Sequence, residues 1–363
     1  MTRTPIPGAW TGAELERSGQ WLRRFDDGHR AEIAAALAAV TAAGLPETGF
    51  GKADFPLGRT ATLLADVAEE LEEGCGAVRL QGLDVERYDE AELRRIFWGI
   101  GAHLGIALFQ NSRGEIMGEV RDEGMGSQGG GMAEPGKVLA SRARARSTGP
   151  LRFHTDRCDV IALLAARNSK AGGVSKLASI RTIHNEMLRR RPDLLELLFQ
   201  PYWRRRSEDI EAEQIGRFVA LPVFGLQDGK LTSQYSRTFV EQAQEDPGIP
   251  RLTAAQNEAL DLLAEIAEAT CLHAPFTQGD IQLLNNHVIY HGRTAYENDA
   301  AAGQERLLLR LWLAMPGSRA LPPGFEVYWG ETAPGVVRGG TLQADGRRAP
   351  AVPAEARGVP VLV

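Results

Sequence analysis

Cysteine is scarce in this sequence, and its scarcity argues against a disulfide scaffold. Cys75, Cys158 and Cys271 are the complete set in 363 residues, and they stand too far apart to form a cysteine-based metal motif. A chain with so few cysteines does not depend on an oxidising compartment. We therefore expect it to work in a reducing, cytoplasmic environment.

Long apolar runs and an excess of basic residues are also missing. No run approaches the roughly 18 apolar residues that a membrane span requires, and the first seven residues lack the apolar core of a signal peptide. Lys and Arg number 41 against 47 Asp and Glu, and this net charge of -6 argues against nucleic acid as the main partner. The basic run from Trp203 to Arg206 has no second basic or aromatic platform, so we interpret it as a solvated surface patch. A small-molecule partner is left as the expectation, and a homo-oligomer stays open.

What the sequence does contain is typical of a mainly β protein with flanking helices. Apolar residues at helical spacing predict helices at residues 29–43, 60–73, 89–104, 181–190 and 192–198, and another beginning at Thr253. Short apolar or alternating runs predict strands at residues 77–80, 160–166, 174–179, 281–290 and 306–313. Within residues 281–290, Asn285-Asn286 is the expected interruption. Strands separated by turns, with helices before and between them, indicate an antiparallel barrel or sandwich backed by helices.

The patterns divide the chain into three expected regions. Residues 1–73 form an N-terminal helical region packed on the core, residues 74–316 form the β-rich domain, and the Gly- and Pro-rich residues 317–363 form an irregular C-terminal tail. Residues 111–150 show no clear periodicity, and a stretch of this length is usually either a functional lid or disordered. Its position directly before His154 favours a lid near 111–150.

The residues with the clearest chemical meaning are His154 and Asp156. Side chains at i and i+2 leave the same face of a strand, so this imidazole and this carboxylate could share one metal ion. A second histidine would complete a two-histidine, one-carboxylate set with open positions, as non-heme Fe(II) oxygenases require. His-x-Asp alone is a weak signal, and a polar strand end is the alternative. His287 and His291 compete as the third ligand, and the turn that Gly292-Arg293 predicts favours His291.

A second chemical signal is the alternation that begins at Arg306. Arg306, Arg310 and Trp312 occupy one face of the predicted strand, and leucines occupy the other. Two arginines that face a protein interior need anions to meet them. The alternative is an edge strand with outward-facing charges, which the presence of Trp312 on the same face disfavours.

Together these motifs resemble the taurine/2-oxoglutarate dioxygenase family, the clavaminate-synthase-like branch of the Fe(II)/2-oxoglutarate-dependent oxygenases. The parts occur in the family's order between about Gly74 and Pro316: His154-Thr155-Asp156, Gly172-Gly173-Val174-Ser175, Gly279-Asp280, His291-Gly292-Arg293 and Arg306-x-x-x-Arg310. The resemblance implies a double-stranded β-helix (jelly-roll) core with flanking helices.

The resemblance also implies roles for individual residues. Fe(II) would be held by His154, Asp156 and His291, and 2-oxoglutarate would occupy two further positions on the metal. Its far carboxylate would meet Arg306 and Ser175, while Arg310 would meet the near carboxylate or an anionic substrate. The presence of Asp156 disfavours halogenation. The implied reaction is therefore a hydroxylation or related C–H oxidation by O2, with release of succinate and CO2.

The substrate is less well defined by the sequence. Gln110, Asn111 and Arg310 are candidates to contact it, although a simple turn at Gln110-Asn111 is an equal alternative. The contacts of the taurine enzymes find no match here, which favours another small, anionic, amino-acid-like molecule. Two other functions remain open: a zinc hydrolase using the same ligands, and a non-catalytic metal- or small-acid-binding protein of the same fold. The arginine pair argues against the hydrolase.

Overall fold

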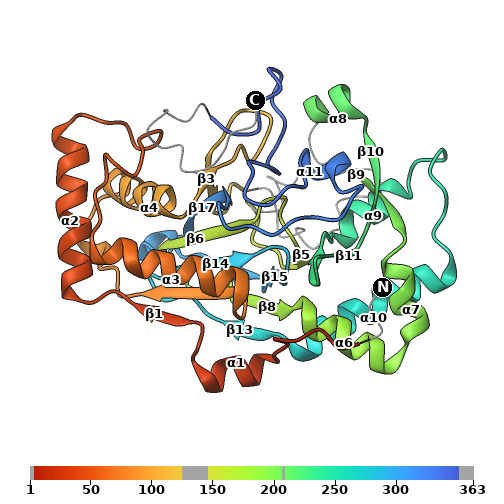
Figure 1. Ribbon diagram of the computed structural model, residues 1–363. Coiled ribbons are helices and arrows are strands. Elements are labelled where there is room, and N and C mark those ends of the chain that lie inside the picture. The colour runs from red at the N-terminus through yellow and green to blue at the C-terminus, as the bar shows by residue number, and fades with distance from the viewer. Residues whose placement is uncertain (1–3, 125–145, 207–208, 351–363) are drawn as a thin grey trace.

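The computed structural model describes residues 4–124, 146–206 and 209–350. Two β-sheets form the centre of the molecule, and helices lie on their outer flanks (Figure 1). This arrangement confirms the mainly β jelly-roll core with flanking helices. In the described part of the chain, no helix combines the length and the apolar character that crossing a membrane would require.

The larger sheet has seven strands in the order β1-β2-β14-β6-β17-β3, with β4 also paired to β17. Its strands, in the order of the sheet, are Leu22–Arg24 (β1), Ala77–Gln81 (β2), Ile281–Asn285 (β14), Val160–Arg167 (β6), Leu307–Ala314 (β17), Ile106–Ala107 (β3) and Met117–Val120 (β4). Every pairing is antiparallel except that of β1 with β2.

The smaller sheet has the order β13-β8-β15-β5 and is antiparallel throughout. Its strands are Leu272–Ala274 (β13), Ser175–Ser179 (β8), Ile289–Arg293 (β15) and Leu151–His154 (β5). The short turn at residues 286–288 carries the chain from β14 in the larger sheet to β15 in this one. The interruption predicted at Asn285-Asn286 within residues 281–290 is therefore the point where the chain passes from one sheet to the other.

In the described residues, three two-stranded ribbons make up the remaining sheets. Their strands are Pro201–Arg205 (β9) with Phe218–Pro222 (β10), Phe224–Gln227 (β11) with Lys230–Ser233 (β12), and Ala171–Gly172 (β7) with Tyr296–Glu297 (β16). The last ribbon lies beside the smaller sheet, because β7 leads into β8 and β16 follows β15.

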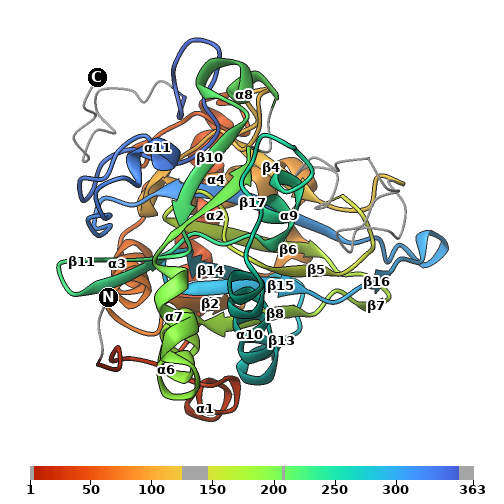
Figure 2. The ribbon, with the colours of Figure 1, turned by 90° about the vertical axis from the view of Figure 1, so that its right-hand side faces the viewer.

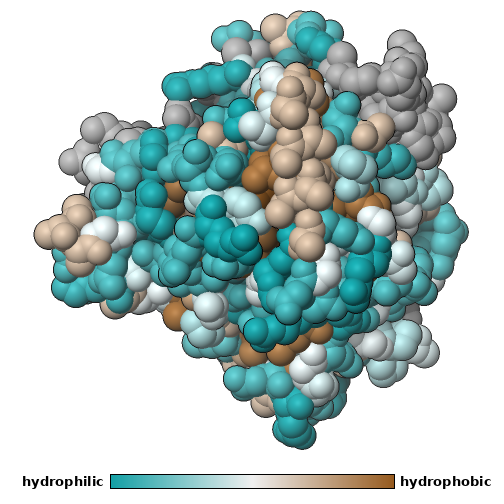
Figure 3. Space-filling model, turned by 90° about the vertical axis from the view of Figure 1, so that its left-hand side faces the viewer, coloured by the Kyte–Doolittle hydropathy of each residue, from teal (hydrophilic) through white to brown (hydrophobic). Residues whose placement is uncertain are grey.

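The helices that lie on the larger sheet are Asp27–Ala42 (α2), Arg59–Glu73 (α3) and Glu90–Leu104 (α4). The first helix, Gly12–Ser18 (α1), packs instead against β13 of the smaller sheet. Asp26 and Asp89 begin α2 and α4 with capping boxes, and α3 buries a stripe that includes Leu64, Val67 and Leu71. The outer side of α2 carries exposed alanines, and the flank that α2 forms is otherwise mainly hydrophilic (Figure 3).

The other helices lie around the smaller sheet and the ribbons. Helices Ile180–Arg190 (α6), Pro192–Leu198 (α7) and Ala254–Thr270 (α10) stand in front of the smaller sheet in Figure 2. Shorter helices are Asp209–Ile215 (α8), Arg237–Ala243 (α9) and Glu326–Trp329 (α11), with 3-10 turns at Val85–Arg87 and Ala300–Ala302.

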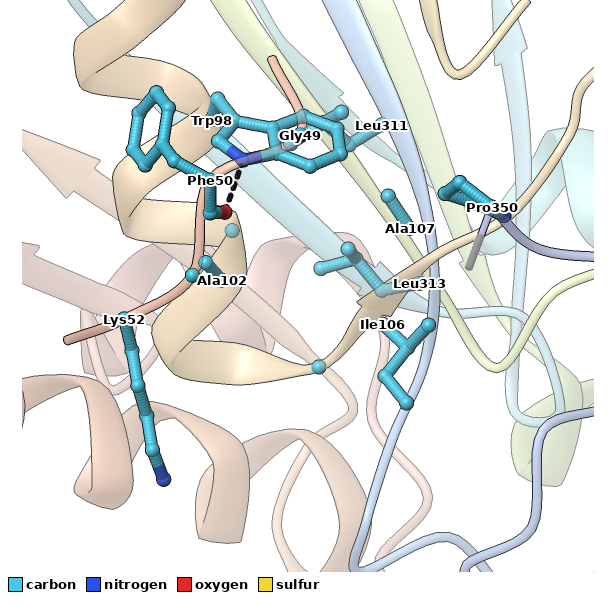
Figure 4. Close-up of a pocket in the computed structure, with 13 residues that line it drawn as sticks. Gly49, Phe50, Lys52, Trp98, Ala102, Ile106, Ala107, Leu311, Leu313 and Pro350 are labelled. Carbon is cyan, nitrogen blue, oxygen red and sulfur yellow. Dashed lines mark hydrogen bonds between the residues drawn. The ribbon is translucent and has the colours of Figure 1, made fainter. Parts of the chain in front are cut away.

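Strand β17 shows the alternation that the sequence predicted. Leu311 and Leu313 face α4, where they line an apolar hollow with Phe50, Trp98 and Pro350, among other residues (Figure 4). The indole Nε1 of Trp98 donates to the carbonyl of Phe50 over 2.7 Å across this hollow. Arg310 and Trp312 leave the opposite face of β17, which is turned toward the smaller sheet.

The prediction of a solvated basic patch at residues 203–206 is wrong. Arg204 is 2% exposed and Arg206 is 5% exposed. Arg204 donates to the carbonyls of Gln234 and Leu221, and Arg206 donates to those of Gly216 and Val327. Backbone carbonyls from distant segments satisfy these guanidinium groups, and this allows them to be buried.

The three-region division at residues 73 and 316 stays a prediction. The N-terminal region contributes β1 to the larger sheet as well as three helices. In the C-terminal region, α11 is the one helix that the described residues contain, and Arg338 is fully buried against Asp159.

Candidate active site

His154, Asp156 and His291 converge between the two sheets. His154 ends β5 and His291 lies in β15, and the two residues are directly paired in register. Their ring centroids are 4.3 Å apart. Asp156 Oδ1 is 3.9 Å from His154 Nε2, and its Oδ2 is 3.8 Å from His291 Nε2. One donor atom from each residue can be chosen so that all three lie within 4.8 Å of one another.

Neighbouring groups orient these three side chains. His154 Nδ1 lies 2.8 Å from the carbonyl of Arg152, which leaves Nε2 directed at the site. Trp312 Nε1 donates to Asp156 Oδ2 over 3.0 Å, and the Asp156 amide donates to Asn286 Oδ1 over 3.0 Å. His291 Nδ1 is buried and has no hydrogen-bond partner among the described residues. Supporting contacts of this kind are typical of metal ligands.

The protonation states of the site also suit a metal ion. Burial, reinforced by the charge of His154, lowers the pKa of His291 to about 3, so this imidazole is neutral at physiological pH. Burial alone would raise the pKa of Asp156, but His291, Arg310 and His154 together bring it below its usual value. A neutral imidazole and an ionised carboxylate are the forms that bind metals. The residues present therefore fit a two-histidine, one-carboxylate iron centre.

The three residues open onto a cavity whose walls are apolar and cationic. Its other lining residues are Val120, Leu151, Ile161, Leu163, Ser175, Phe276, Gly292, Arg293, Arg306, Leu308 and Arg310. Asp156 is the single acidic residue in this lining, against three arginines. A cavity with this charge balance attracts anionic ligands.

Arg306 is a buried cation that lacks an acidic partner in the described structure. It is 4% exposed, its Nε has no hydrogen-bond partner there, and its guanidinium lies 5.4 Å from the ring centre of Tyr296 and 5.9 Å from that of Phe276. Burial, and then the charge of Arg293, lowers the pKa of Arg306 to about 10, which leaves it charged at neutral pH. A buried charge of this kind is stable only when an anion meets it.

The glycine motif before β8 gives Arg306 its space. Gly173 has a φ of +66°, and a β-carbon at this position would overlap Arg306 Nη1. Two residues later, Ser175 is 6% exposed and its Oγ accepts a hydrogen bond from Gln282 Nε2 over 3.0 Å. The Ser175 hydroxyl can therefore still donate its own proton to a ligand.

Arg310 is held in place by one of the predicted substrate contacts. Its Nε donates to Gln110 Oε1 over 2.7 Å, while Gln110 Nε2 donates to the carbonyls of Arg310 and Ile116. Its guanidinium lies 5.3 Å from the ring centre of Trp312. Gln110 thus fixes the direction of Arg310 and uses its own polar atoms in doing so.

Asn111 has a different position from the one the sequence suggested. Its Oδ1 accepts from the Arg113 amide over 2.9 Å, and its Nδ2 donates to Glu115. It is absent from the residues that line the described cavity. The turn interpretation of Asn111 fits these contacts, and the structure gives no support to its contact with substrate.

His287, the competing histidine, belongs to a separate buried cluster. Its Nε2 is 2.9 Å from Asp159 Oδ1 and its Nδ1 is 2.8 Å from Thr232 Oγ1. Arg338 Nε also donates to Asp159 Oδ1, over 2.9 Å. His287 lies in the turn between β14 and β15, so the parity of one unbroken strand does not apply. Of the two downstream histidines, the geometry brings His291 to the site.

Other predicted or possible features lie outside this centre. The lid predicted near 111–150 falls largely on residues 125–145, which lie outside the described residues. On either side of them, the Glu123 amide donates to the carbonyl of Arg146 over 3.1 Å. A second group of possible metal ligands, Glu268, Cys271 and His273, is largely exposed, and Glu268 already pairs with Lys176 at 2.6 Å.

One protein-family model matches the part of the chain that contains this site. The model of the family described as "Taurine catabolism dioxygenase TauD, TfdA family" matches residues 41–312, which include all of the residues above that line the cavity. The chain belongs to this family. This member is a 2-oxoglutarate-dependent non-heme iron dioxygenase, as its motifs predicted. The hydrolase and binding-protein alternatives find no support.

Two curated proteins are similar to this family member over most of its length. FR-33289 synthase of Streptomyces rubellomurinus (strain ATCC 31215) is 32% identical over 347 residues, covering 92% of this chain and 97% of that protein. The taurine hydroxylase-like protein SAT17 of Stachybotrys chartarum (strain CBS 109288 / IBT 7711) is 32% identical over 329 residues, covering 88% of this chain and 82% of that protein.

Solved structures share the fold of this family member at low sequence identity. Asparagine oxygenase in complex with Fe(II), 2S,3S-3-hydroxyasparagine and succinate has a TM-score of 0.63 at 18% identity, covering 81% of this chain and 94% of that one. The non-heme iron oxygenase OrfP, in complex with Fe and alpha-ketoglutaric acid, has a TM-score of 0.60 at 15% identity, with coverages of 81% and 93%.

Proposed function

We propose that this protein oxidises a C–H bond of a small anionic substrate, with Fe(II) held by His154, Asp156 and His291. The observation that carries this proposal is the convergence of the three ligands on a cavity that also contains Arg306 and Arg310. When bound, Fe(II) and 2-oxoglutarate supply the oxidation of the substrate by O2, with release of succinate and CO2.

Arg306 and Ser175 are the residues we propose for the far carboxylate of 2-oxoglutarate. Both are buried in the wall of the cavity, and each has a hydrogen-bond donor available to a ligand. A guanidinium matches a carboxylate with two parallel hydrogen bonds. Gly173 keeps the guanidinium of Arg306 in the required position because it leaves space for Nη1.

Arg310 is the residue we propose for the anionic group of the substrate or for the near carboxylate of 2-oxoglutarate. Gln110 holds its Nε, which leaves the two terminal nitrogens for a ligand. The charge of Arg310 is one of the causes that lower the pKa of Asp156. A group bound by Arg310 therefore lies near the residues that we propose as metal ligands. Structural relatives contain hydroxylated amino acids, and small acids of that kind are the substrate class we propose.

The remaining side chains position the ligands and exclude water. Trp312 and Asn286 orient Asp156 from two directions, and the carbonyl of Arg152 fixes the ring of His154. The apolar walls, Ile161, Leu163, Phe276 and Leu308 among them, keep the cavity dry around the reacting groups. An oxidising reaction needs this exclusion because water would otherwise compete with the substrate.

Anaerobic addition of Fe(II) and 2-oxoglutarate to the metal-free protein tests the proposal. We expect a visible charge-transfer absorption that appears with both additions and is absent from His154→Ala and His291→Ala. A colourless protein that binds Zn(II) but no 2-oxoglutarate would contradict it.

The two arginines are separated by titrating variants with 2-oxoglutarate. Arg306→Ala removes a buried charge-assisted pair, and such losses cost about 2–5 kcal/mol, or roughly thirtyfold to several-thousandfold in affinity. Arg310→Ala should have a smaller effect on this affinity and should reduce the coupling of succinate release to substrate oxidation. If Arg310→Ala abolishes 2-oxoglutarate binding and Arg306→Ala does not, the two roles are reversed.

A further inference from the structure

Arg293 is a third buried guanidinium in the active-site cavity, and none of the roles above uses it. It is 5% exposed and lines the cavity together with Arg306. It follows His291 by two residues in β15 and is directly paired in register with Ser175 of β8. Residues at i and i+2, and residues directly opposite in an antiparallel pair, share one face of a sheet. The side chain of Arg293 therefore leaves the same inner face as His291 and Ser175.

The nitrogen atoms of Arg293 fall into two groups. Its Nη2 donates to the carbonyls of Ser147 and Gly149 over 2.7 and 2.6 Å. Its Nε and Nη1 are buried, and neither has a hydrogen-bond partner in residues 4–124, 146–206 or 209–350. Nη2 therefore holds the segment 147–149, and the other two nitrogens of Arg293 have no function in that contact. Buried guanidinium donors in this state are costly unless a ligand accepts from them.

Arg293 and Arg306 are close enough to influence each other. The guanidinium carbons of Arg293 and Arg306 lie 4.8 and 5.4 Å from the ring centre of Tyr296, and the charge of Arg293 is one of the causes that lower the pKa of Arg306. The acid that acts on Arg293 is Asp122, which is solvent-exposed. The charge of Asp122 is a cause of the pKa of Arg293 and is not one for Arg306, so these two buried cations call for a further anion at this end of the cavity.

We propose that Arg293 is a second guanidinium for the far carboxylate of 2-oxoglutarate, which it meets together with Arg306 and Ser175. This inference rests on the proposed function, because it takes 2-oxoglutarate as the ligand of that end of the cavity. A carboxylate has about four acceptor sites on two oxygens, so it can accept from two guanidinium groups and one hydroxyl. The carboxylate would then link Arg306, which directly precedes β17, to Arg293 of β15.

The test compares two 2-oxo acids that differ only in the far carboxylate. 2-Oxopentanoate has the carbon chain and the metal-binding end of 2-oxoglutarate but ends in a methyl group. Both acids are titrated anaerobically into the Fe(II)-loaded protein, and the midpoint of the charge-transfer absorption is measured. The variants are Arg293→Gln, Arg293→Lys and, as a reference for the far carboxylate, Arg306→Gln.

Arg204→Gln is the matched control. Like Arg293, Arg204 is a buried arginine that donates to backbone carbonyls and keeps an Nε without a partner in the described residues, but it is absent from the lining of this cavity. Any general cost of losing a buried guanidinium appears in this variant too. Partial unfolding would raise the midpoints for both acids by the same factor, so the difference between the two acids does not depend on it. Arg293→Lys keeps the charge should Arg293→Gln fold poorly.

We expect Arg293→Gln to raise the midpoint for 2-oxoglutarate roughly tenfold to a hundredfold, the range for a lost charged hydrogen bond, and Arg293→Lys to raise it less. The midpoint for 2-oxopentanoate should stay within about twofold of the wild-type value in both variants. An unchanged midpoint for 2-oxoglutarate, or an equal rise for both acids, would overturn the role of Arg293. If Arg306→Gln in that case raises the midpoint for 2-oxoglutarate and leaves the midpoint for 2-oxopentanoate unchanged, the proposed function stands. A wild-type protein that binds neither acid would overturn both.

Discussion

Replacing Trp312 with phenylalanine removes one hydrogen bond from the carboxylate that we propose as an iron ligand. Trp312 Nε1 donates to Asp156 Oδ2 over 3.0 Å, and both side chains are more than 90% buried. Phenylalanine keeps most of the apolar packing but provides no donor. Losing a hydrogen bond to a charged group costs about 1.5–3 kcal/mol, and loss of a group that orients a metal ligand typically weakens metal binding about tenfold to a hundredfold.

The assay is anaerobic calorimetric titration of metal-free Trp312→Phe with Fe(II), without 2-oxoglutarate. Trp329→Phe is the control: it removes the same atoms from a fully buried indole whose Nε1 has no partner in the described part of the chain. We expect the dissociation constant for Fe(II) to rise about tenfold or more in Trp312→Phe and to change little in Trp329→Phe. If Trp312→Phe is folded and binds Fe(II) as tightly as the wild type, other contacts orient Asp156 and this reasoning is wrong.

Three further predictions follow from other parts of the structure. His291→Ala should abolish tight iron binding, whereas His287→Ala should lower the melting temperature and leave iron affinity largely intact. The reverse result in the same calorimetric titration would mean that His287, and not His291, binds the iron. Gly173→Ala should lower stability by about 1–2 kcal/mol, because of its left-handed backbone, and should weaken 2-oxoglutarate binding because its methyl group would displace Arg306; unchanged binding would show that Arg306 can shift without loss. Burial would raise the pKa of Asp159, but Arg338 and His287 lower it from 3.8 to about 2, so its stabilisation is complete above pH 3.8 and is lost as the pH falls toward 2. This amounts to about 2 kcal/mol, and chemical denaturation of Asp159→Asn should show a flatter dependence of stability on pH in that window.

Local signals in the sequence were sufficient for the longer helices and for two of the three proposed metal ligands. Capping boxes and apolar stripes are set within a few residues, so α2, α4 and α10 begin close to where the pattern predicted. His154 and Asp156 are two residues apart, and both reach the site as predicted, although β5 ends at His154 and Asp156 lies beyond it. The alternation of leucines with Arg310 and Trp312 likewise predicted which side chains lie on opposite faces of β17.

Contacts between distant segments could not be predicted in this way. The choice of His291 as the proposed third ligand depends on the register of β15 against β5, which pairs His291 with His154, and on the turn that removes His287 from that strand. The hydrogen bond from Trp312 to Asp156 joins residues 156 positions apart. Arg204 was misread as a surface group because the carbonyls that satisfy it belong to Leu221 and Gln234. Nothing within the basic run itself signals such partners.

Anomalous diffraction at the iron edge, from crystals grown anaerobically with Fe(II) and 2-oxoglutarate, tests the central claim most directly. The account predicts one strong peak within bonding distance of His154, Asp156 and His291, with the far carboxylate of 2-oxoglutarate in contact with Arg306. A crystal that binds iron at another group, such as Glu268, Cys271 and His273, and leaves the first three residues without a peak would contradict it.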